Sequence, residues 1–230
     1  MADRMSLKSK LLVRFLLAII FIAAMLFIPA GSLKFWQGWA FMAVVFIPLS
    51  FFFPYLYKHD PQLLERRLAA KEKGGTQKVI QVVGGMIAFP SFLLPGLDYR
   101  FGWSRASLRP VPLWLTLLSQ GLVFGCFLLV FWVMRVNSFA SRTIRVEPGQ
   151  KAIASGPYRF VRHPMYFALV GIYIAISPAL GTYLAVPTFA LIIPLIIIRL
   201  LNEEKILRQE LPGYTEYCQR TRFRLIPLVW

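Results

Sequence analysis

Residues 155–166, SGPYRFVRHPMY, form a dense polar segment that leads directly into an apolar run beginning at Phe167. Pro164 favours the first position of a helix, which leaves the following backbone amides unpaired at the positive end of the helix dipole. That potential favours the neutral form of His163, whereas Arg162 adds a permanent charge and a planar fork of donors. The segment therefore predicts a site for a carboxylate or another anion.

A second polar segment lies at the end of the last long apolar run. Arg199, Asn202 and Glu203 are spaced i, i+3 and i+4, so they share one face of a helix, and Glu204 lies one position round. A cation and a carboxylate on one face suit the binding of a zwitterion. Tyrosines and arginines follow, from Tyr214 to Pro227.

Each of these features also has a purely structural interpretation. A single histidine at a membrane boundary can be a hydrogen-bonded structural side chain, and an arginine can contact lipid headgroups. Arg199 and Glu203 can form an intrahelical ion pair worth only a few tenths of a kcal/mol. The chain has no GxGxxG motif and no P-loop. Cys126, Cys218 and His59 lack the spacing of metal ligands, so neither a disulfide nor a metal site is predicted.

The composition indicates the environment of the two segments. The chain has 230 residues, of which 57% are hydrophobic, a mean hydropathy of +0.61 and a formal net charge of +16. Soluble domains rarely combine these values. A membrane-spanning helix needs roughly 20 mostly apolar residues. Candidate ranges are 11–29, 36–57, 79–97, 111–136, a short one at 164–178, and 183–201. We expect an all-α, polytopic integral membrane protein with about six transmembrane helices.

Basic residues are distributed unevenly over the loops. All but four of the 26 Lys and Arg residues lie at the N-terminus, in the second and fourth loops, or from Arg199 onward; the exceptions are Lys34, Arg100, Arg105 and Arg109. Because short cytoplasmic loops collect Lys and Arg, both termini and both polar segments are predicted to be cytoplasmic. Topology thus accounts for the net charge, and no nucleic-acid partner is expected. The first span is predicted to be a retained anchor rather than a signal peptide.

The connections predict how the segments meet. The uncharged stretch 177–182 contains a proline and a glycine, so it predicts a turn that makes a helical hairpin of the fifth and sixth spans. The hairpin brings the two polar segments to one level. Asp60-Pro61 begins a short amphipathic helix expected on the membrane surface and ended by 73–75. Gly84-Gly85 predicts close helix packing. We expect one domain, 1–230, with the functional part at about 137–230.

The order of the motifs resembles a known family, the integral-membrane methyltransferases that include isoprenylcysteine carboxyl methyltransferase and the phospholipid N-methyltransferases. The resemblance covers residues 151–230, and Phe167-Ala168 and Pro212-Gly213 depart from the family pattern. The matching residues are Gly156-Pro157-Tyr158, Arg162-His163-Pro164-Met165-Tyr166, Glu203-Glu204, Tyr214, Tyr217 and Ile226-Pro227.

The resemblance implies S-adenosylmethionine as cofactor and no metal. It implies Arg199, Glu203 and Glu204 as catalytic residues. The implied cofactor-binding residues are Gly156, Pro157, Tyr158, Arg162, His163, Pro164, Tyr166, Glu204, Tyr214 and Tyr217. The glutamates suit the cofactor's ammonium or ribose, Arg162 its carboxylate, and the tyrosines its adenine or sulfonium. Arg199→Ala and Glu204→Ala are each expected to abolish transfer and to leave the protein folded.

The acceptor implied by the resemblance is a membrane-embedded amphiphile that enters sideways between helices. The favoured one is the carboxylate of an isoprenylcysteine-like molecule, which Arg199 can orient without a base. A phospholipid amine is the alternative, and it requires a carboxylate or His163 to take a proton. An NADPH-dependent sterol-type reductase and a non-catalytic membrane subunit or transporter are further alternatives. The sequence leaves open the oligomeric state and the membrane, which is the plasma or inner membrane in a bacterium and the endoplasmic reticulum in a eukaryote.

Overall fold

The computed structural model describes residues 7–69, 75–107, 109–140 and 146–230, and within these ranges it contains helices and no strand. The all-α prediction is therefore confirmed. The elements are α1 Leu7–Ala30, α2 Trp36–His59, α3 Pro61–Ala69, α4 Gly75–Phe101, α5 Trp103–Ser107, α6 Leu113–Val136, the 3-10 turn η1 Gly156–Arg159, α7 Pro164–Ala179, α8 Val186–Ala190, α9 Ile192–Glu210 and α10 Tyr214–Arg220.

Among the described residues, five helical stretches are long and apolar enough to cross a membrane. They are α1, α2, α4, α6 and the continuous stretch Val186–Glu210 formed by α8 and α9. The short fifth range of the sequence prediction corresponds to α7, which has 16 residues. A full crossing by α7 stays a prediction, because roughly 20 residues are needed to cover the hydrocarbon core.

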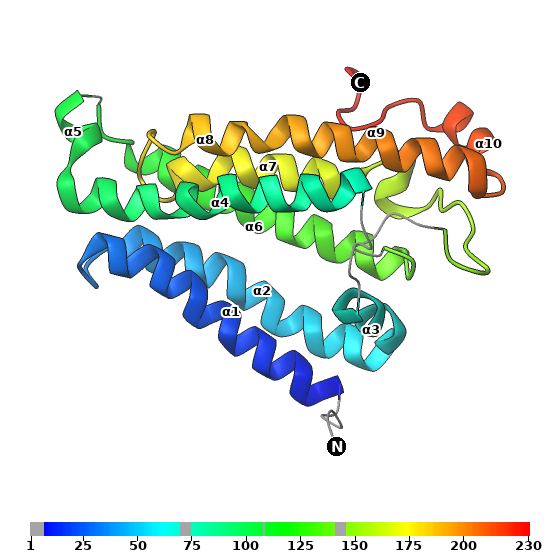
Figure 1. Ribbon diagram of the computed structural model, residues 1–230, viewed down its shortest axis with the longest axis horizontal. Helices are drawn as coiled ribbons and strands as arrows, with labels where there is room; N and C mark the ends of the chain where they lie inside the picture. Colours follow the sequence, from blue (N-terminus) through cyan, green and yellow to red (C-terminus); the bar gives the residue numbers. More distant parts are fainter. Residues whose placement is uncertain (1–6, 70–74, 108, 141–145) are drawn as a thin grey trace.

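The helices lie side by side, and α1 and α2 diverge from the others toward one end (Figure 1). At the other end α1 crosses α4 closely, since a Cβ atom on Gly96 would lie 2.6 Å from the Leu26 carbonyl oxygen. α7 packs against α6 equally closely, because a Cβ atom on Gly171 would lie 2.7 Å from Cys126 Sγ. The predicted hairpin is present as α7 followed by α8 and α9, with Gly181 at φ +78° in its turn.

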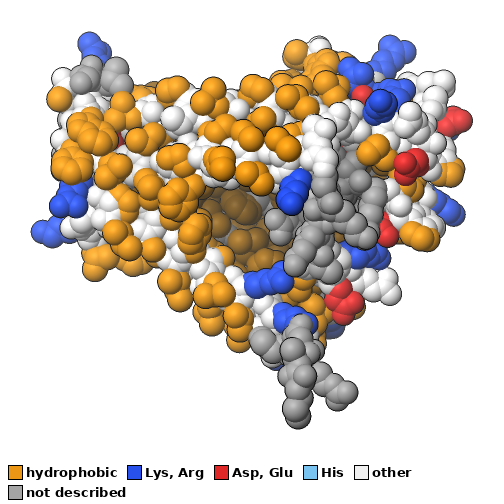
Figure 2. Space-filling view, in the orientation of Figure 1, with side chains coloured by type: hydrophobic (Ala, Val, Ile, Leu, Met, Phe, Trp, Pro, Cys, Tyr) orange, Lys and Arg blue, Asp and Glu red, His pale blue; other side chains and the backbone are white. Residues whose placement is uncertain are grey.

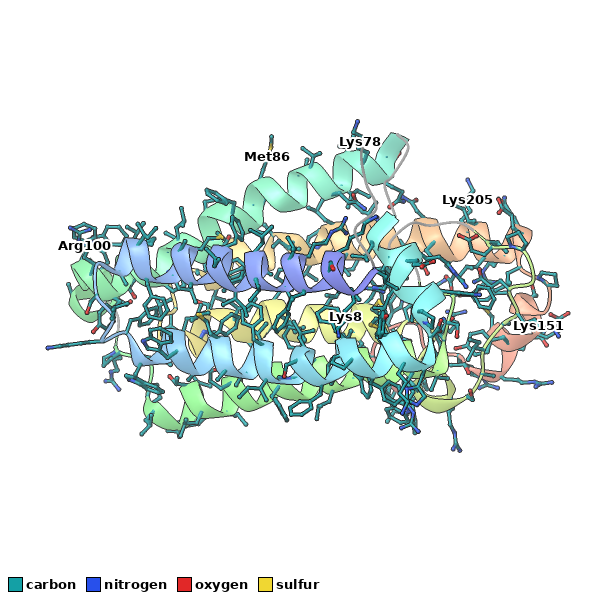
Figure 3. The ribbon with its side chains drawn as sticks, turned by 90° about the horizontal axis from the view of Figure 1, so that it is seen from below. Lys8, Lys78, Met86, Arg100, Lys151 and Lys205 are labelled. Atoms are coloured by element: carbon teal, nitrogen blue, oxygen red, sulfur yellow. The ribbon has the colours of Figure 1, made fainter. Side chains whose placement is uncertain are left out.

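We call the polar end of the bundle the end at which α2, α6 and α9 end and α4 and α7 begin. Figure 3 shows Lys78, Lys151 and Lys205 toward this end and Arg100 at the opposite end. Met86 lies between them on α4, 70% exposed and pointing away from the bundle (Figure 3). The side chains thus form an apolar belt with most of its basic residues on one side, as expected of a membrane protein.

The opposite end contains a buried carboxylate that ties the hairpin turn to α4. Asp98 accepts hydrogen bonds from the Ser104 amide at 2.7 Å and from Thr182 Oγ1 at 2.5 Å. The Ser104 hydroxyl donates to the same carboxylate. Thr182 lies in the turn between α7 and α8, so this network holds α7 and α9 in position for the site at the polar end.

The surface helix predicted after Asp60 is present as α3, but its apolar face does not lie on a membrane surface. Leu63 and Leu64 are 0% and 2% exposed and pack with Leu56 of α2 and Met134 of α6. Protein burial therefore outweighs lipid contact for this short helix, and the sequence prediction was wrong on this point. Asp60 caps the helix as expected, because its Oδ1 accepts a hydrogen bond from the Leu63 amide at 3.0 Å. The predicted helix end at 73–74 lies outside the described residues.

Candidate active site

A cavity of about 670 Å³ begins at the polar end and extends between α4, α7 and α9. Its polar part is lined by residues of η1, α10 and the segments 137–140 and 150–153. Its deeper part is lined mostly by small and aliphatic side chains of α4, α7 and α9, with Tyr173 and Gln81 among them. One continuous space therefore joins a polar region to the apolar interior of the membrane-spanning helices. Residues 141–145, which belong to the functional range expected at 137–230, lie outside the described residues.

Glu204 is 3% exposed and lies among three arginines. Its Oε1 pairs with Arg162 Nη1 at 3.0 Å and with Arg208 Nη2 at 3.7 Å, and its Oε2 accepts a hydrogen bond from Arg224 Nε at 2.7 Å. Arg162 is also buried, whereas Arg208 and Arg224 are partly exposed. Glu204 itself does not line the cavity. Its carboxylate therefore links the predicted polar segments through Arg162 and Arg224.

The backbone strengthens this link between segments that are far apart in the sequence. The Arg162 amide donates to the Phe223 carbonyl, and the His163 amide donates to the Arg224 carbonyl, each at 2.9 Å. The end of the sequence therefore runs alongside the two residues that precede α7. The expectation that the two polar segments become neighbours is met by this geometry.

His163 is buried at the start of α7 and lines the cavity. Burial lowers the pKa of its imidazole to about 4, with Arg162 and Arg224 lowering it further and Glu204 opposing them. His163 is therefore neutral near pH 7, as the sequence predicts, although burial is the larger cause and not the helix dipole. Its Nε2 has no hydrogen-bond partner among the described residues.

Three tyrosines line the polar part of the cavity. Tyr158 Oη accepts a hydrogen bond from Asn137 Nδ2 at 2.7 Å, and Tyr217 Oη donates to the Tyr158 carbonyl at 2.8 Å. Burial raises the pKa of Tyr158 to about 12, so its phenol is protonated. Tyr214 Oη is buried and has no hydrogen-bond partner in the part of the chain that the structure describes. These tyrosines thus add uncharged polar groups to the cavity wall.

Arg199, Glu203 and Tyr166 line the cavity where its polar and apolar parts meet. Tyr166 Oη donates to Glu203 Oε2 at 2.6 Å, and Arg199 Nη1 donates to Gln77 Oε1 of α4 at 3.1 Å. The predicted acidic pair is therefore divided, because Glu203 reaches the cavity and Glu204 faces the arginines. Gln77 was not among the predicted site residues.

The family comparison covers much of this region. Residues 115–209 match the model of the isoprenylcysteine carboxyl methyltransferase (ICMT) family. Over these residues the chain is similar to that family. The match includes all of α7, most of α6 and α9, and both predicted acidic residues. No curated protein matches the chain at a significant level. The similarity to this family supports a methyltransferase-like family for the matched region.

Gly156 and Pro157 of the ICMT-like motif do not line the cavity. Gly156 has φ +58°, and a Cβ atom there would lie 2.9 Å from Val136 Cγ2 of α6. A larger residue would therefore strain the turn and collide with α6. Pro157 is buried beside it, whereas Pro164 lines the cavity. The structure gives Gly156 and Pro157 a role in placing Tyr158.

Sequence reasoning missed the contribution of α3 and α4, which lie outside the ICMT match. Arg67 of α3 lines the cavity and donates to the Ala140 carbonyl at 2.6 Å. Gln81, Gly84 and Gly85 of α4 line it as well. Gly84-Gly85 predicts close packing from the sequence, yet a Cβ atom on Gly85 would meet no atom within 4 Å. Gly85 therefore leaves open space, whereas a Cβ atom on Gly84 would lie 3.8 Å from Leu195 Cδ1 of α9.

The low pKa of His163 predicts a loss of stability in acid. Since an unfolded histidine titrates near pH 6.5 and the folded one near 4, the unfolded state binds more protons between these values. Stability should therefore fall as pH falls from 6.5 to 4, by up to about 1.4 kcal/mol per pH unit for this one group. Between pH 6.5 and 5 we expect the wild type to lose about 2 kcal/mol more than His163→Gln, as measured by denaturant unfolding in detergent. Equal losses would contradict the assignment.

Proposed function

We propose that this protein transfers a methyl group from S-adenosylmethionine to the carboxylate of a membrane-embedded, isoprenylcysteine-like acceptor. The observation that carries the proposal is the single cavity that joins a polar region to an apolar one. A water-soluble, zwitterionic cofactor fits the first region, and the tail of an amphiphile fits the second. Arg199 and Glu203 lie between them.

The residues present fit the cofactor. The cavity volume of about 670 Å³ falls in the range of small-molecule sites. His163 Nε2 and Tyr214 Oη are buried and unpartnered among the described residues, so each gains from a polar ligand group. Among the described lining residues, Glu203 supplies the acidic side chain, which suits an ammonium group. Tyr158, Tyr166 and Tyr217 offer faces for an adenine or a sulfonium.

When bound, S-adenosylmethionine supplies an electrophilic methyl group on a sulfonium. Because the reaction neutralises a cation in an in-line displacement, the protein must align the reactants and exclude water. The tyrosines and the neutral His163 add uncharged polar groups to a wall that also carries Arg199 and Glu203. A carboxylate acceptor is already ionised near pH 7, so Arg199 has only to orient it. Glu203 is held in place by the Tyr166 hydroxyl.

A phospholipid amine is the second candidate acceptor. An amine must lose a proton during methylation, and Glu203 on the cavity wall is a group that can take it. The two acceptors give chemically different products. Methyl esters release methanol in base, whereas N-methyl groups do not.

We place the polar end in the cytoplasm, with both termini on that side. Lys78, Lys151 and Lys205 at this end follow the rule that cytoplasmic loops are basic (Figure 3). The cofactor would then reach the cavity from the cytoplasm and the acceptor from the bilayer. The membrane is the plasma or inner membrane in a bacterium and the endoplasmic reticulum in a eukaryote.

A lateral entrance beside α4 would admit the acceptor. On the face shown in Figure 2 the molecule is hollowed between α4 and the α1–α2 pair, and the visible walls are hydrophobic. Gly85 is exposed and lines the cavity. We expect Gly85→Leu to lower kcat/KM for a long-chain acceptor by roughly tenfold, since this corresponds to about 1.4 kcal/mol of lost access or binding.

Gly125→Leu is the matched control for Gly85→Leu. Gly125 is an exposed glycine of α6 at which a Cβ atom would likewise meet no atom within 4 Å, but it does not line the cavity. Transfer assays in nanodiscs should show a normal kcat/KM for Gly125→Leu. If the two substitutions lower kcat/KM equally, or if neither lowers it, the acceptor does not enter beside α4.

The proposed function is tested by binding of S-adenosylhomocysteine and NADPH, measured by calorimetry on the purified protein in detergent. Saturable S-adenosylhomocysteine binding is expected, followed by transfer of a radioactive methyl group to a prenylated cysteine in base-labile form. A base-stable product on a phospholipid would favour the amine acceptor. Binding of NADPH alone would favour a sterol-type reductase, and binding of neither would favour a non-catalytic membrane subunit.

A further inference from the structure

A loop near the end of the sequence carries the two most exposed large hydrophobic side chains of the described residues, together with a third exposed one. Leu228 is 87% exposed, Val229 75% and Ile226 42%. These residues follow α10 and lie outside every candidate membrane span. Apolar side chains in a span are exposed because lipid covers them, but that explanation does not apply automatically to a loop. The exposure of residues 226–229 therefore needs a separate cause.

Backbone hydrogen bonds join the two ends of this loop, and the Leu228 side chain points away from the protein. The amides of Val229 and Trp230 donate to the Ile226 carbonyl at 3.2 and 3.0 Å, and the Leu225 amide donates to the Trp230 carbonyl at 2.9 Å. Leu228 has φ +65°, a left-handed conformation that favours glycine. A leucine there is strained and gains almost no contact from the protein. The described residues therefore do not supply a contact that offsets this strain.

The position of the loop indicates what covers it. Figure 1 shows the chain folding back from α10 along α9, so that its end lies near the level at which α4 begins. This is the level at which the apolar belt gives way to the polar end. Arg220 and Arg222, both exposed, precede the loop, and Trp230 is partly exposed beside it. Apolar side chains next to arginines and a tryptophan are typical of a membrane–water interface.

We propose that residues 226–229 insert into the boundary between headgroups and acyl chains of the leaflet at the polar end. The inserted loop fixes the residues before it, and these are the ones whose carbonyls accept the Arg162 and His163 amides. Arg224 also donates to Glu204. Membrane contact at the loop thus stabilises one wall of the cavity. This proposal does not depend on the methyl-transfer reaction.

The proposal is tested with an environment-sensitive fluorescent label attached to the cysteine of Leu228→Cys. Cys218 is replaced by serine so that it is not labelled. Cys126 is retained because it is buried. The labelled protein is placed in nanodiscs of phosphatidylcholine and phosphatidylglycerol that carry a nitroxide at carbon 5 or carbon 12 of the acyl chain. Gln209→Cys is the matched control, because Gln209 is exposed at the end of α9, beyond the level at which α4 begins (Figure 1).

We expect roughly a twofold loss of fluorescence at position 228 with the carbon-5 nitroxide, a smaller loss with the carbon-12 nitroxide, and no loss at position 209. Val229→Cys should behave like Leu228→Cys and replaces it if that variant does not fold. Equal, water-like emission at 228 and 209 would overturn the proposal. Protected emission without lipid quenching, rising with the number of protein copies per nanodisc, would assign the loop to a protein–protein contact and overturn it as well.

Discussion

Replacing Glu204 with alanine is expected to destabilise the polar end of the bundle and to abolish binding of S-adenosylhomocysteine. The carboxylate is buried with Arg162 and also pairs with Arg224. Removing one member of a buried ion pair typically costs about 3–5 kcal/mol, because the remaining charge stays buried without compensation. Arg162 would either draw in water or move, and the segment that carries His163 would move with it. This expectation replaces the sequence-based one that Glu204→Ala stays folded.

The Glu204 prediction is checked by thermal unfolding and by calorimetric titration in the same detergent. Arg208→Ala is the control, since Arg208 lies 3.7 Å from the same carboxylate but is 41% exposed. Exposed pairs contribute about 0–1 kcal/mol, so this variant should keep nearly normal stability and binding. If Glu204→Ala melts and binds like Arg208→Ala, the arginine cluster does not hold the site together.

The adjacent glutamates show what the sequence could predict and what it could not. Spacing placed Arg199 and Glu203 on one helix face, and both line the cavity. Glu204 is one position round, and nothing in the sequence shows whether that direction leads into the cavity or into a cluster of arginines. The partner Arg224 comes from beyond α10, and its pairing with the start of α7 depends on how the end of the chain folds back. Only the tertiary structure separates the two carboxylates.

The fold was predictable wherever hydropathy alone decides it. The ranges expected to span the membrane correspond to α1, α2, α4, α6 and α8–α9, with α7 as the short one. The errors concern how helices pack. α3 has the amphipathic pattern of a surface helix, but Leu63 and Leu64 find their contacts on α2 and α6. Gly84-Gly85 suits both close packing and an opening, because the absence of a side chain permits either.

Arg199→Ala is expected to lower kcat/KM for the carboxylate acceptor by about 100-fold, which corresponds to about 2.7 kcal/mol. This is the size expected for a charge-assisted hydrogen bond to an ionised group that is lost in a water-poor cavity. Arg199 lies where the polar and apolar parts of the cavity meet, which is where the carboxylate of an acceptor with its tail among α4, α7 and α9 would lie. Arg199→Lys keeps the charge and loses the planar fork, so an intermediate loss is expected.

The Arg199 prediction separates acceptor orientation from a structural ion pair. Gln77→Ala is the control, because it removes only the side chain that accepts a hydrogen bond from Arg199 Nη1. Initial rates with a prenylated cysteine and affinity for S-adenosylhomocysteine should both be measured. If Arg199 orients the acceptor, kcat/KM falls in Arg199→Ala and cofactor affinity changes by less than about threefold, under 1 kcal/mol. Loss of S-adenosylhomocysteine affinity in parallel with kcat/KM would assign Arg199 to the cofactor. An unchanged rate would leave Arg199 only a structural role in its contacts with α4 and α9. An arginine with only that role would not change kcat/KM and cofactor affinity to different extents.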